Sequence, residues 1–209
     1  MYEEESSGGG RARRGGRGRS GARTRSGSRS RDDAATPETA PVDQVGKARE
    51  ICLNLLATRP RTRTELRAKL LERGIEEPVA DQVLSRLNEV GLVDDAAFAE
   101  MWVRSRHNYQ GMSRRALSFE LRRKGVADEL AADAVSAVDS EAEEAKAREL
   151  VRKRMRSVAG TAPEQTLIRR LVGMLARKGY SEGLAYRVVR DEMRNAGNDT
   201  DLLDDALPD

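Results

Sequence analysis

The sequence predicts an all-α protein made of tandem three-helix repeats. Charged residues make up 35% of the chain and aromatic residues only 3%, a composition that favours helices with solvated faces over a sandwich or barrel of strands. In addition, one pattern of apolar residues around a glycine occurs three times along the chain. Together these observations predict three repeats, over residues 44–93, 94–139 and 140–195.

The two ends of the chain differ from the rest in composition. Residues 1–43 are expected to be disordered, because they carry almost no large apolar side chains. Nine arginines and no acid lie between Arg11 and Arg31, a composition that suits loose phosphate contacts or, equally, a solubilising tail with no fixed partner. Residues 196–209 form an acidic tail that is expected to repel a polyanion or to fold back over basic residues.

The repeats align on Gly74, Gly125 and Gly179, which lie 51 and 54 residues apart. Leucine stands eight and four residues before each glycine, and apolar residues follow directly after it and five residues after it. The aligned positions are Leu66, Leu117 and Leu171; Leu70, Leu121 and Leu175; Ile75, Val126 and Tyr180; and Val79, Leu130 and Leu184. Leucines four residues apart form one helix face, and a glycine after them is typical of a left-handed helix cap.

A further helix is predicted before each of these segments, over residues 44–57, 95–108 and 140–157. The apolar face of each helix needs neighbouring helices to be buried, so each repeat becomes a unit of three helices and about fifty residues. This period is too long for the 34-residue helical pairs, and armadillo repeats of 40 to 47 residues fit less well.

The residues that could in principle carry out catalysis are better explained by structural roles. Asp94 and Asp95 precede a predicted helix and lack a partner acid, base or metal ligand, so one of them is expected to cap that helix. Trp102 could stack on a base, but with Phe98 one turn earlier it is expected to pack in the core. His107 has no evident nucleophile or acid beside it, and Cys52 lies on an apolar helix face. We therefore expect no catalytic, cofactor or metal site, and no enzyme.

The expected compartment is the cytoplasm. A single cysteine cannot form an internal disulfide, which suits a reducing environment. No apolar run is long enough to cross a membrane, and the N-terminus lacks the apolar core of a signal peptide.

Basic residues recur near the same points of each repeat and predict a binding surface. Recurrent cations on stacked repeats suit a phosphate backbone or an acidic protein groove, although many ordinary helices also end in solvated cations. The candidate residues are Arg59, Arg61, Arg63, Arg67, Arg104, Arg106, Arg114, Arg115, Arg122, Arg123, Lys124, Arg169, Arg170, Arg177 and Lys178.

Three segments together resemble the RecX family of bacterial regulators of the RecA recombinase. They read LLATRPRTRTELRAKLLERGI, VGLVDDAAFAEMWVRSRHNYQGMSRRALSFELRRKGV and LVGMLARKGY, and the resemblance extends over about residues 45–194. It implies three three-helix repeats in an elongated, curved module. It also implies a monomer without a cofactor that binds RecA and the RecA filament on single-stranded DNA.

The resemblance further implies inhibition of filament growth, strand exchange, ATP hydrolysis and co-protease function, and hence a role in DNA repair and the SOS response. Our hypothesis is that a basic face occupies the filament groove, with Arg114, Arg115, Arg122, Arg123 and Lys124 as central contacts, and also touches single- or double-stranded DNA. One alternative is a helical DNA-binding or nucleoid-associated protein that acts without RecA. Another is a protein-interaction solenoid with no nucleic-acid role.

Overall fold

The computed structural model describes residues 41–158 and 163–197, and every regular element in these ranges is a helix. In chain order the elements are α1 (Pro41–Thr58), α2 (Arg63–Glu72), α3 (Glu77–Glu89), α4 (Asp95–Ser105), the π-helix η1 (Arg106–Gln110), α5 (Arg114–Arg123), α6 (Asp128–Ser136), α7 (Ser140–Val158), α8 (Glu164–Arg177) and α9 (Glu182–Asn195). The expected disordered tail, residues 1–43, and the expected acidic tail, residues 196–209, lie outside the described residues except at their inner ends. Residues 41–43 belong to α1, so the helical part of the chain begins slightly earlier than expected, and residues 196 and 197 directly follow α9.

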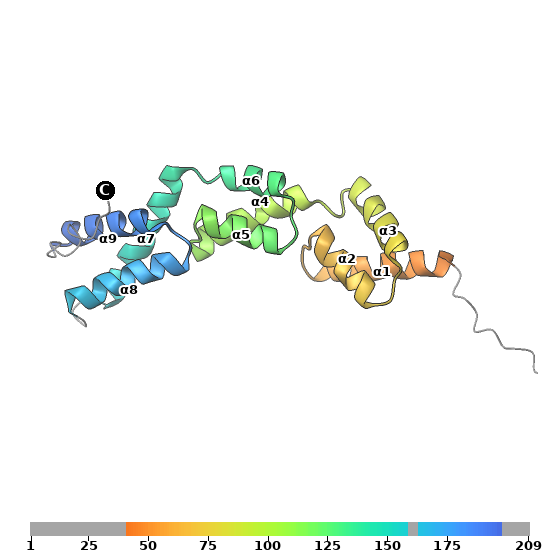
Figure 1. The fold of residues 1–209 in the computed structure, drawn as a ribbon, viewed down its shortest axis with the longest axis horizontal. Coiled ribbons are helices and arrows are strands. Elements are labelled where there is room, and N and C mark those ends of the chain that lie inside the picture. The colour runs from red at the N-terminus through yellow and green to blue at the C-terminus, as the bar shows by residue number, and fades with distance from the viewer. Residues whose placement is uncertain (1–40, 159–162, 198–209) are drawn as a thin grey trace, which may run out of the picture. The chain divides into compact units, whose positions relative to one another are not determined.

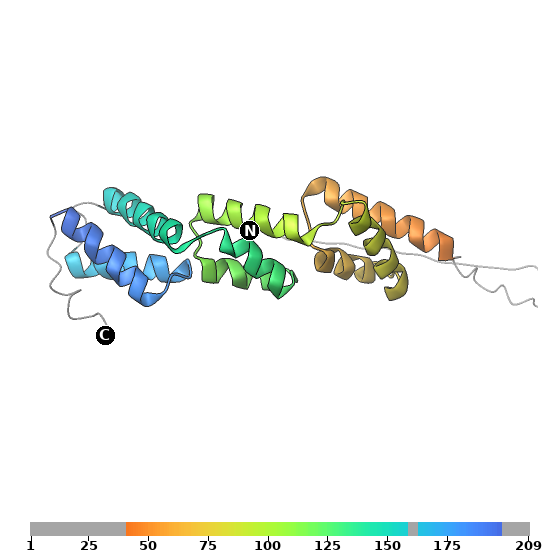
Figure 2. The same cartoon turned by 90° about the horizontal axis from the view of Figure 1, so that it is seen from above.

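The helices pack in three groups of three, as Figures 1 and 2 show. We call α1–α3 repeat 1, α4–α6 with η1 repeat 2, and α7–α9 repeat 3. Each repeat has its own apolar core. The leucines that precede each aligned glycine are fully buried in these cores: Leu66 and Leu70, Leu117 and Leu121, Leu171 and Leu175. The predicted fold class of three three-helix repeats is thus confirmed, and the neighbours that bury each apolar face belong to the same repeat.

The three aligned glycines end the second helix of each repeat in the same way. Gly74, Gly125 and Gly179 have positive φ angles of 76°, 76° and 86°. In each repeat the N–H of the apolar residue after the glycine donates to the leucine carbonyl four residues before the glycine, at 3.1, 3.1 and 3.2 Å. This six-to-one bond is the helix-ending motif that a left-handed residue permits, as the sequence predicts.

The first helix of repeat 2 ends differently from the prediction. The α-helix stops at Ser105 and the chain continues as η1, whereas an unbroken helix to Asn108 was expected. Gly111, with a φ of 62°, closes this wider turn, and its N–H donates to the His107 carbonyl at 3.0 Å. The buried His107 ring holds the turn from inside, with Nδ1 3.0 Å from the Met112 carbonyl oxygen.

Trp102 and Cys52 pack in the cores, as predicted. Cys52 is fully buried in repeat 1. Trp102 is half-buried in repeat 2 and stacks on Phe98, with ring centroids 5.5 Å apart. Its indole N–H donates to Glu120 Oε2 at 2.8 Å, so the polar atom of the ring is satisfied while its face stays apolar.

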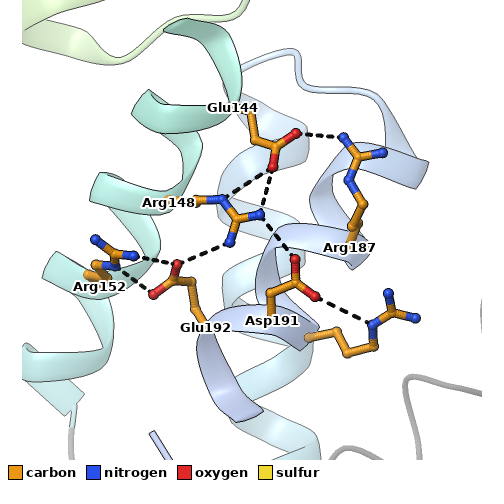
Figure 3. Close-up of polar contacts among 7 residues, drawn as sticks. Glu144, Arg148, Arg152, Arg187, Asp191 and Glu192 are labelled. Atoms are coloured by element: carbon orange, nitrogen blue, oxygen red, sulfur yellow. Dashed lines mark hydrogen bonds and ion pairs between the residues drawn. The ribbon is translucent and has the colours of Figure 1, made fainter. Parts of the chain in front are cut away.

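A network of ion pairs joins α7 to α9 inside repeat 3 (Figure 3). Glu192 is 4% exposed, and it accepts from Arg152 Nε at 2.6 Å and from Arg148 Nη1 at 3.3 Å. Arg148 also donates to Glu144 at 2.6 Å and to Asp191 at 3.0 Å. Hydrogen bonding to Glu144 raises the pKa of Arg148, and the Arg152 guanidinium lowers the pKa of Glu192. Both shifts favour the charged forms, so the network is ionised at neutral pH.

Polar contacts connect repeat 1 to repeat 2, and we call this contact the first joint. The Thr62 hydroxyl donates to the Lys124 carbonyl at 2.7 Å, and the Thr64 hydroxyl donates to the Gly125 carbonyl at 3.0 Å. Lys124 Nζ donates to Glu65 Oε1 at 2.8 Å. The start of α2 therefore rests on the C-terminal end of α5.

Equivalent residues build the second joint, between repeats 2 and 3. The Ser113 N–H, at the start of α5, donates to the carbonyl of Lys178 at 3.0 Å, just after α8. The Tyr180 hydroxyl donates to the Gly111 carbonyl at 3.2 Å. The Arg114 N–H donates to Glu143 of α7 at 2.8 Å. One arrangement thus occurs twice: the start of one second helix meets the glycine cap of the next.

Asp94 and Asp95 have separate structural roles in the first joint. Asp94 Oδ1 accepts from the Ala97 N–H at 2.9 Å and caps α4, as predicted for one of the pair. Asp95 Oδ1 accepts from the Arg63 N–H of repeat 1 at 2.8 Å. Burial raises the pKa of Asp95, and the bond from Arg63 offsets only part of that effect. The Asp95 carboxylate therefore acts as a hydrogen-bond acceptor in a place where its charge is unfavourable.

Substitutions should separate these roles. Asp94→Ala is expected to lower the free energy of unfolding by about 1 kcal/mol through loss of the cap. Asp95→Ala should cost about 1–3 kcal/mol because the Arg63 N–H loses its partner, whereas Asp95→Asn keeps an acceptor and should stay close to the parent. Urea unfolding measures all three variants. An Asp95→Asn protein as unstable as Asp95→Ala would show that the charge, and not the acceptor, is what matters.

Candidate functional site

A basic groove lies at the second joint, between α5 and the end of α8. Its volume is about 600 Å³, and it is lined by Arg115, Ala116, Ser118, Phe119, Arg122, Ala176, Arg177, Gly179 and Tyr180. We call it the α5–α8 groove. Three arginines and no acid are among its lining residues, so its electrostatic character is that of an anion-binding surface. Figure 1 shows the end of α8 reaching the start of α5.

The α5 side of the groove follows helical spacing. Arg115, Phe119 and Arg122 are separated by four and three residues, so they share one face of α5. Leu117 and Leu121 occupy the opposite, buried face. The Phe119 side chain is 61% exposed, and the Arg123 guanidinium carbon lies 5.9 Å from the centre of its ring. An aromatic ring thus stands in solvent among arginines.

The groove arginines are only weakly engaged within the chain. Arg122 pairs with Asp128 at 2.7 Å, but both side chains are largely exposed, and exposed pairs contribute little. Among the carboxylates of the described ranges, none lies within 4.0 Å of Arg115 or Arg177. These guanidinium groups are therefore available to a ligand.

The candidate cations of repeat 1 differ, because each has a partner in the same repeat. Arg59 pairs with Glu65 at 3.1 Å, and Arg61 donates to the Leu55 carbonyl at 3.2 Å. Arg63 donates to the Ser85 hydroxyl at 3.1 Å. Arg67 pairs with Asp81 at 2.9 Å and also with Glu77. A ligand would have to compete with these bonds.

Lys124 and Arg106 both have structural contacts at the Trp102 ring. Lys124 Nζ lies 4.3 Å from the centre of the Trp102 ring and pairs with Glu65 across the first joint. The guanidinium carbon of Arg106 lies 4.2 Å from the same ring, and its Nε lies 3.5 Å from Glu120. Lys124, proposed from sequence as a central contact, is thus engaged in holding two repeats together.

The remaining candidate cations divide between the second joint and open surface. Lys178 Nζ donates to the Gln110 carbonyl in the second joint. Arg104, Arg123, Arg169 and Arg170 are exposed, and Arg114 is half-buried. Within the described part of the chain, these five arginines have no ion-pair partner.

Two residues of interest escaped the sequence analysis. Phe119 carried a detectable signal, because it is two residues out of phase with the buried leucines of α5 and lies on the face with the arginines. Glu192 carried none, because an acid in a charged helix looks like any solvated residue until its partners on α7 are known.

The described residues hold no group of three side chains arranged to bind a metal ion. None of the helices within residues 41–158 and 163–197 combines the length and the apolar character needed to cross a bilayer.

The arrangement of the α5–α8 groove is suited to binding a negatively charged ligand.

Comparison with known families assigns each repeat. Residues 48–87 match the model for the first three-helix domain of RecX, residues 94–135 the second and residues 141–189 the third. The regulatory protein RecX of Amycolatopsis mediterranei is 55% identical over 172 residues, which cover 82% of this chain and 98% of that protein. The regulatory protein RecX of Streptomyces coelicolor is 53% identical over 165 residues, covering 79% and 87%.

Solved structures agree with this assignment. The crystal structure of RecX from Lactobacillus salivarius has the same fold, with a TM-score of 0.64 and 23% identity over 72% of this chain and 97% of that one. A second crystal structure of a regulatory protein RecX matches with a TM-score of 0.62 and 28% identity, covering 73% and 74%. Three family domains in order, close relatives over most of the chain and a shared fold place this protein in the RecX family.

Proposed function

We propose that this protein regulates RecA by binding the recombinase and its filament on single-stranded DNA, and that it thereby inhibits filament growth, strand exchange, ATP hydrolysis and co-protease activity. Through this inhibition it would modulate DNA repair and the SOS response. The protein acts by occupying a surface and carries out no chemistry of its own. Membership of a family of regulatory proteins supports the proposal, and the α5–α8 groove is the observation that carries it.

The groove supports the proposal through its charge and its place between repeats. Arg115 and Arg122 come from repeat 2 and Arg177 from repeat 3, so a ligand there contacts both repeats at once. Arg114 and Arg123 lie on the same α5 helix, whereas Lys124 belongs to the first joint. The central contacts of the proposed face are therefore Arg114, Arg115, Arg122, Arg123 and Arg177. Phosphate contacts would make such binding sensitive to salt.

Charge reversal tests the proposal. The double variant Arg115→Glu with Arg177→Glu is expected to raise the concentration that half-inhibits RecA strand exchange by about tenfold or more, because two attractive contacts become repulsive. Its thermal stability should stay close to that of the parent, because neither arginine pairs with a described carboxylate.

The matched control reverses two exposed arginines outside the groove, Arg49→Glu with Arg73→Glu, and so makes the same change in net charge. It should inhibit strand exchange as the parent does. If both double variants inhibited RecA like the parent, the α5–α8 groove would have no part in regulation.

A further inference from the structure

We propose that the α5–α8 groove is a single-strand nucleic-acid subsite, in which a base stacks on Phe119 and the flanking phosphates contact Arg115, Arg122 and Arg177. This proposal rests on the proposed function, because it names a ligand for the same α5–α8 groove. The binding that it predicts involves nucleic acid alone and can be measured without RecA.

Phe119 is unusually exposed for an aromatic residue of a helix. A helix face turned to solvent ordinarily carries polar residues, and α5 obeys this rule with arginines at positions 115, 122 and 123. Phe119 departs from it with 61% of its surface exposed. A single exposed apolar residue is common and means little by itself. Phe119, however, lies within an arginine-lined groove, and this position indicates a binding role.

Arginines flank Phe119 along α5. Phe119 lies between Arg115 and Arg122, which are roughly 10 Å apart along the helix axis at 1.5 Å per residue. A base lying on Phe119 would therefore have a cation on either side of it along the strand. The Arg123 guanidinium, near the Phe119 ring, can add a cation–π contact, and Arg177 supplies a cation from the opposite wall.

The residues of the groove fit a single strand better than other anionic ligands. Aromatic rings that stack on bases, combined with a basic groove along the backbone, are the usual means of binding single strands without sequence preference. An acidic protein segment would use the arginines but would leave the Phe119 ring without a specific partner. A duplex would not offer it an unstacked base. The combination of a largely exposed ring with cations before and after it along the helix favours a single strand.

The test compares two labelled strands of equal length by fluorescence anisotropy: an oligothymidylate, and an abasic strand that keeps the phosphates but lacks the bases. The parent protein should bind the oligothymidylate about tenfold more tightly, the effect of one stacked base. Phe119→Ala should lose this preference while keeping its affinity for the abasic strand, and Phe119→Tyr should retain it. Tyr109→Ala is the matched control, because Tyr109 is 89% exposed and does not line the groove; it should behave as the parent.

The contribution of the arginines is measured separately, by the salt dependence of binding. Arg115→Ala with Arg177→Ala should weaken binding of both strands and reduce the slope of log affinity against log salt by about 1.4, or 0.7 for each lost phosphate contact. The matched control, Arg49→Ala with Arg73→Ala, removes two exposed arginines outside the groove and should leave both affinities and the salt slope unchanged.

Three results would overturn the proposal. Phe119→Ala could keep the preference for the oligothymidylate, or it could lose affinity for both strands by the same factor. The third is that the parent protein binds polyglutamate and not the oligonucleotide. The proposed function can fail independently. If oligonucleotide binding ignores Phe119 while charge reversal in the groove still relieves RecA inhibition, the subsite is wrong and the regulation stands.

Discussion

Gly125→Ala is expected to destabilise the protein markedly more than Gly74→Ala, although both glycines have the same φ of 76°. An alanine in the left-handed region costs about 1–2 kcal/mol, and this cost applies at both positions. At Gly125 the added methyl carbon would also lie 2.4 Å from the Thr64 side chain across the first joint, whereas at Gly74 it meets nothing within 4 Å. Overpacking adds about 1–3 kcal/mol.

Urea unfolding of the two variants measures the difference, which we expect to be about 1–3 kcal/mol. Gly179→Ala serves as a second case, because its methyl carbon would lie 2.6 Å from Ala116 and Ser113 in the second joint. It should resemble Gly125→Ala. Equal destabilisation by Gly74→Ala and Gly125→Ala would mean that the first joint accommodates the added methyl group at little cost in free energy. The two repeats would then not be tightly packed there.

Glu192→Ala is expected to lower the free energy of unfolding by about 3 kcal/mol. Removing one partner of a buried pair typically costs 3–5 kcal/mol. The lower end applies here because Arg148 keeps Glu144 and Asp191, and because Arg152 is 59% exposed and stays hydrated without Glu192. The control is Glu89→Ala, whose pair with Arg86 is exposed on both sides. It should cost under about 1 kcal/mol. A similar effect of both substitutions would show that the network in Figure 3 contributes no more than a surface pair.

The pH dependence of unfolding gives an independent measure of the same network. The Arg152 guanidinium lowers the pKa of Glu192 in the folded protein. A lowered folded pKa adds stability that is complete above the unfolded value of about 4.3 and is lost as pH falls through the folded value. Glu192→Gln should therefore be less stable than the parent at pH 7, and the gap should close as the pH falls below about 4. A gap that stays constant down to pH 2 would exclude an ionic contribution from Glu192.

The sequence was sufficient to predict features that depend on local spacing. Leu66, Leu117 and Leu171 repeat at fixed distances from a glycine, and a buried helix face requires that spacing whatever lies around it. Asp94 and Asp95 precede an apolar helix, and because a helix start requires an acceptor there, the sequence predicts that one of the two caps it. Features of this kind are encoded within a few residues of the chain, so one sequence reveals them.

Features that depend on distant partners were not predictable in the same way. Lys124 and Arg177 are both basic residues near the end of a second helix. Lys124 is half-buried against Trp102 and Glu65, whereas Arg177 lies open in a groove. The difference arises because Lys124 meets the repeat before it, through residues about sixty positions away. Counting charges along the chain locates cations but not their partners, so the sequence alone could not separate the cations that hold repeats together from those that face solvent.

The central claim, that this protein acts on RecA, is tested most directly by titrating the protein against RecA filaments on single-stranded DNA, free RecA and bare DNA at two salt concentrations. The account predicts the tightest binding to filaments and weaker binding to bare DNA, with every affinity that depends on phosphate contacts falling as salt rises. Equal affinity for bare DNA and for filaments would contradict it, and would favour a DNA-binding protein that acts without RecA.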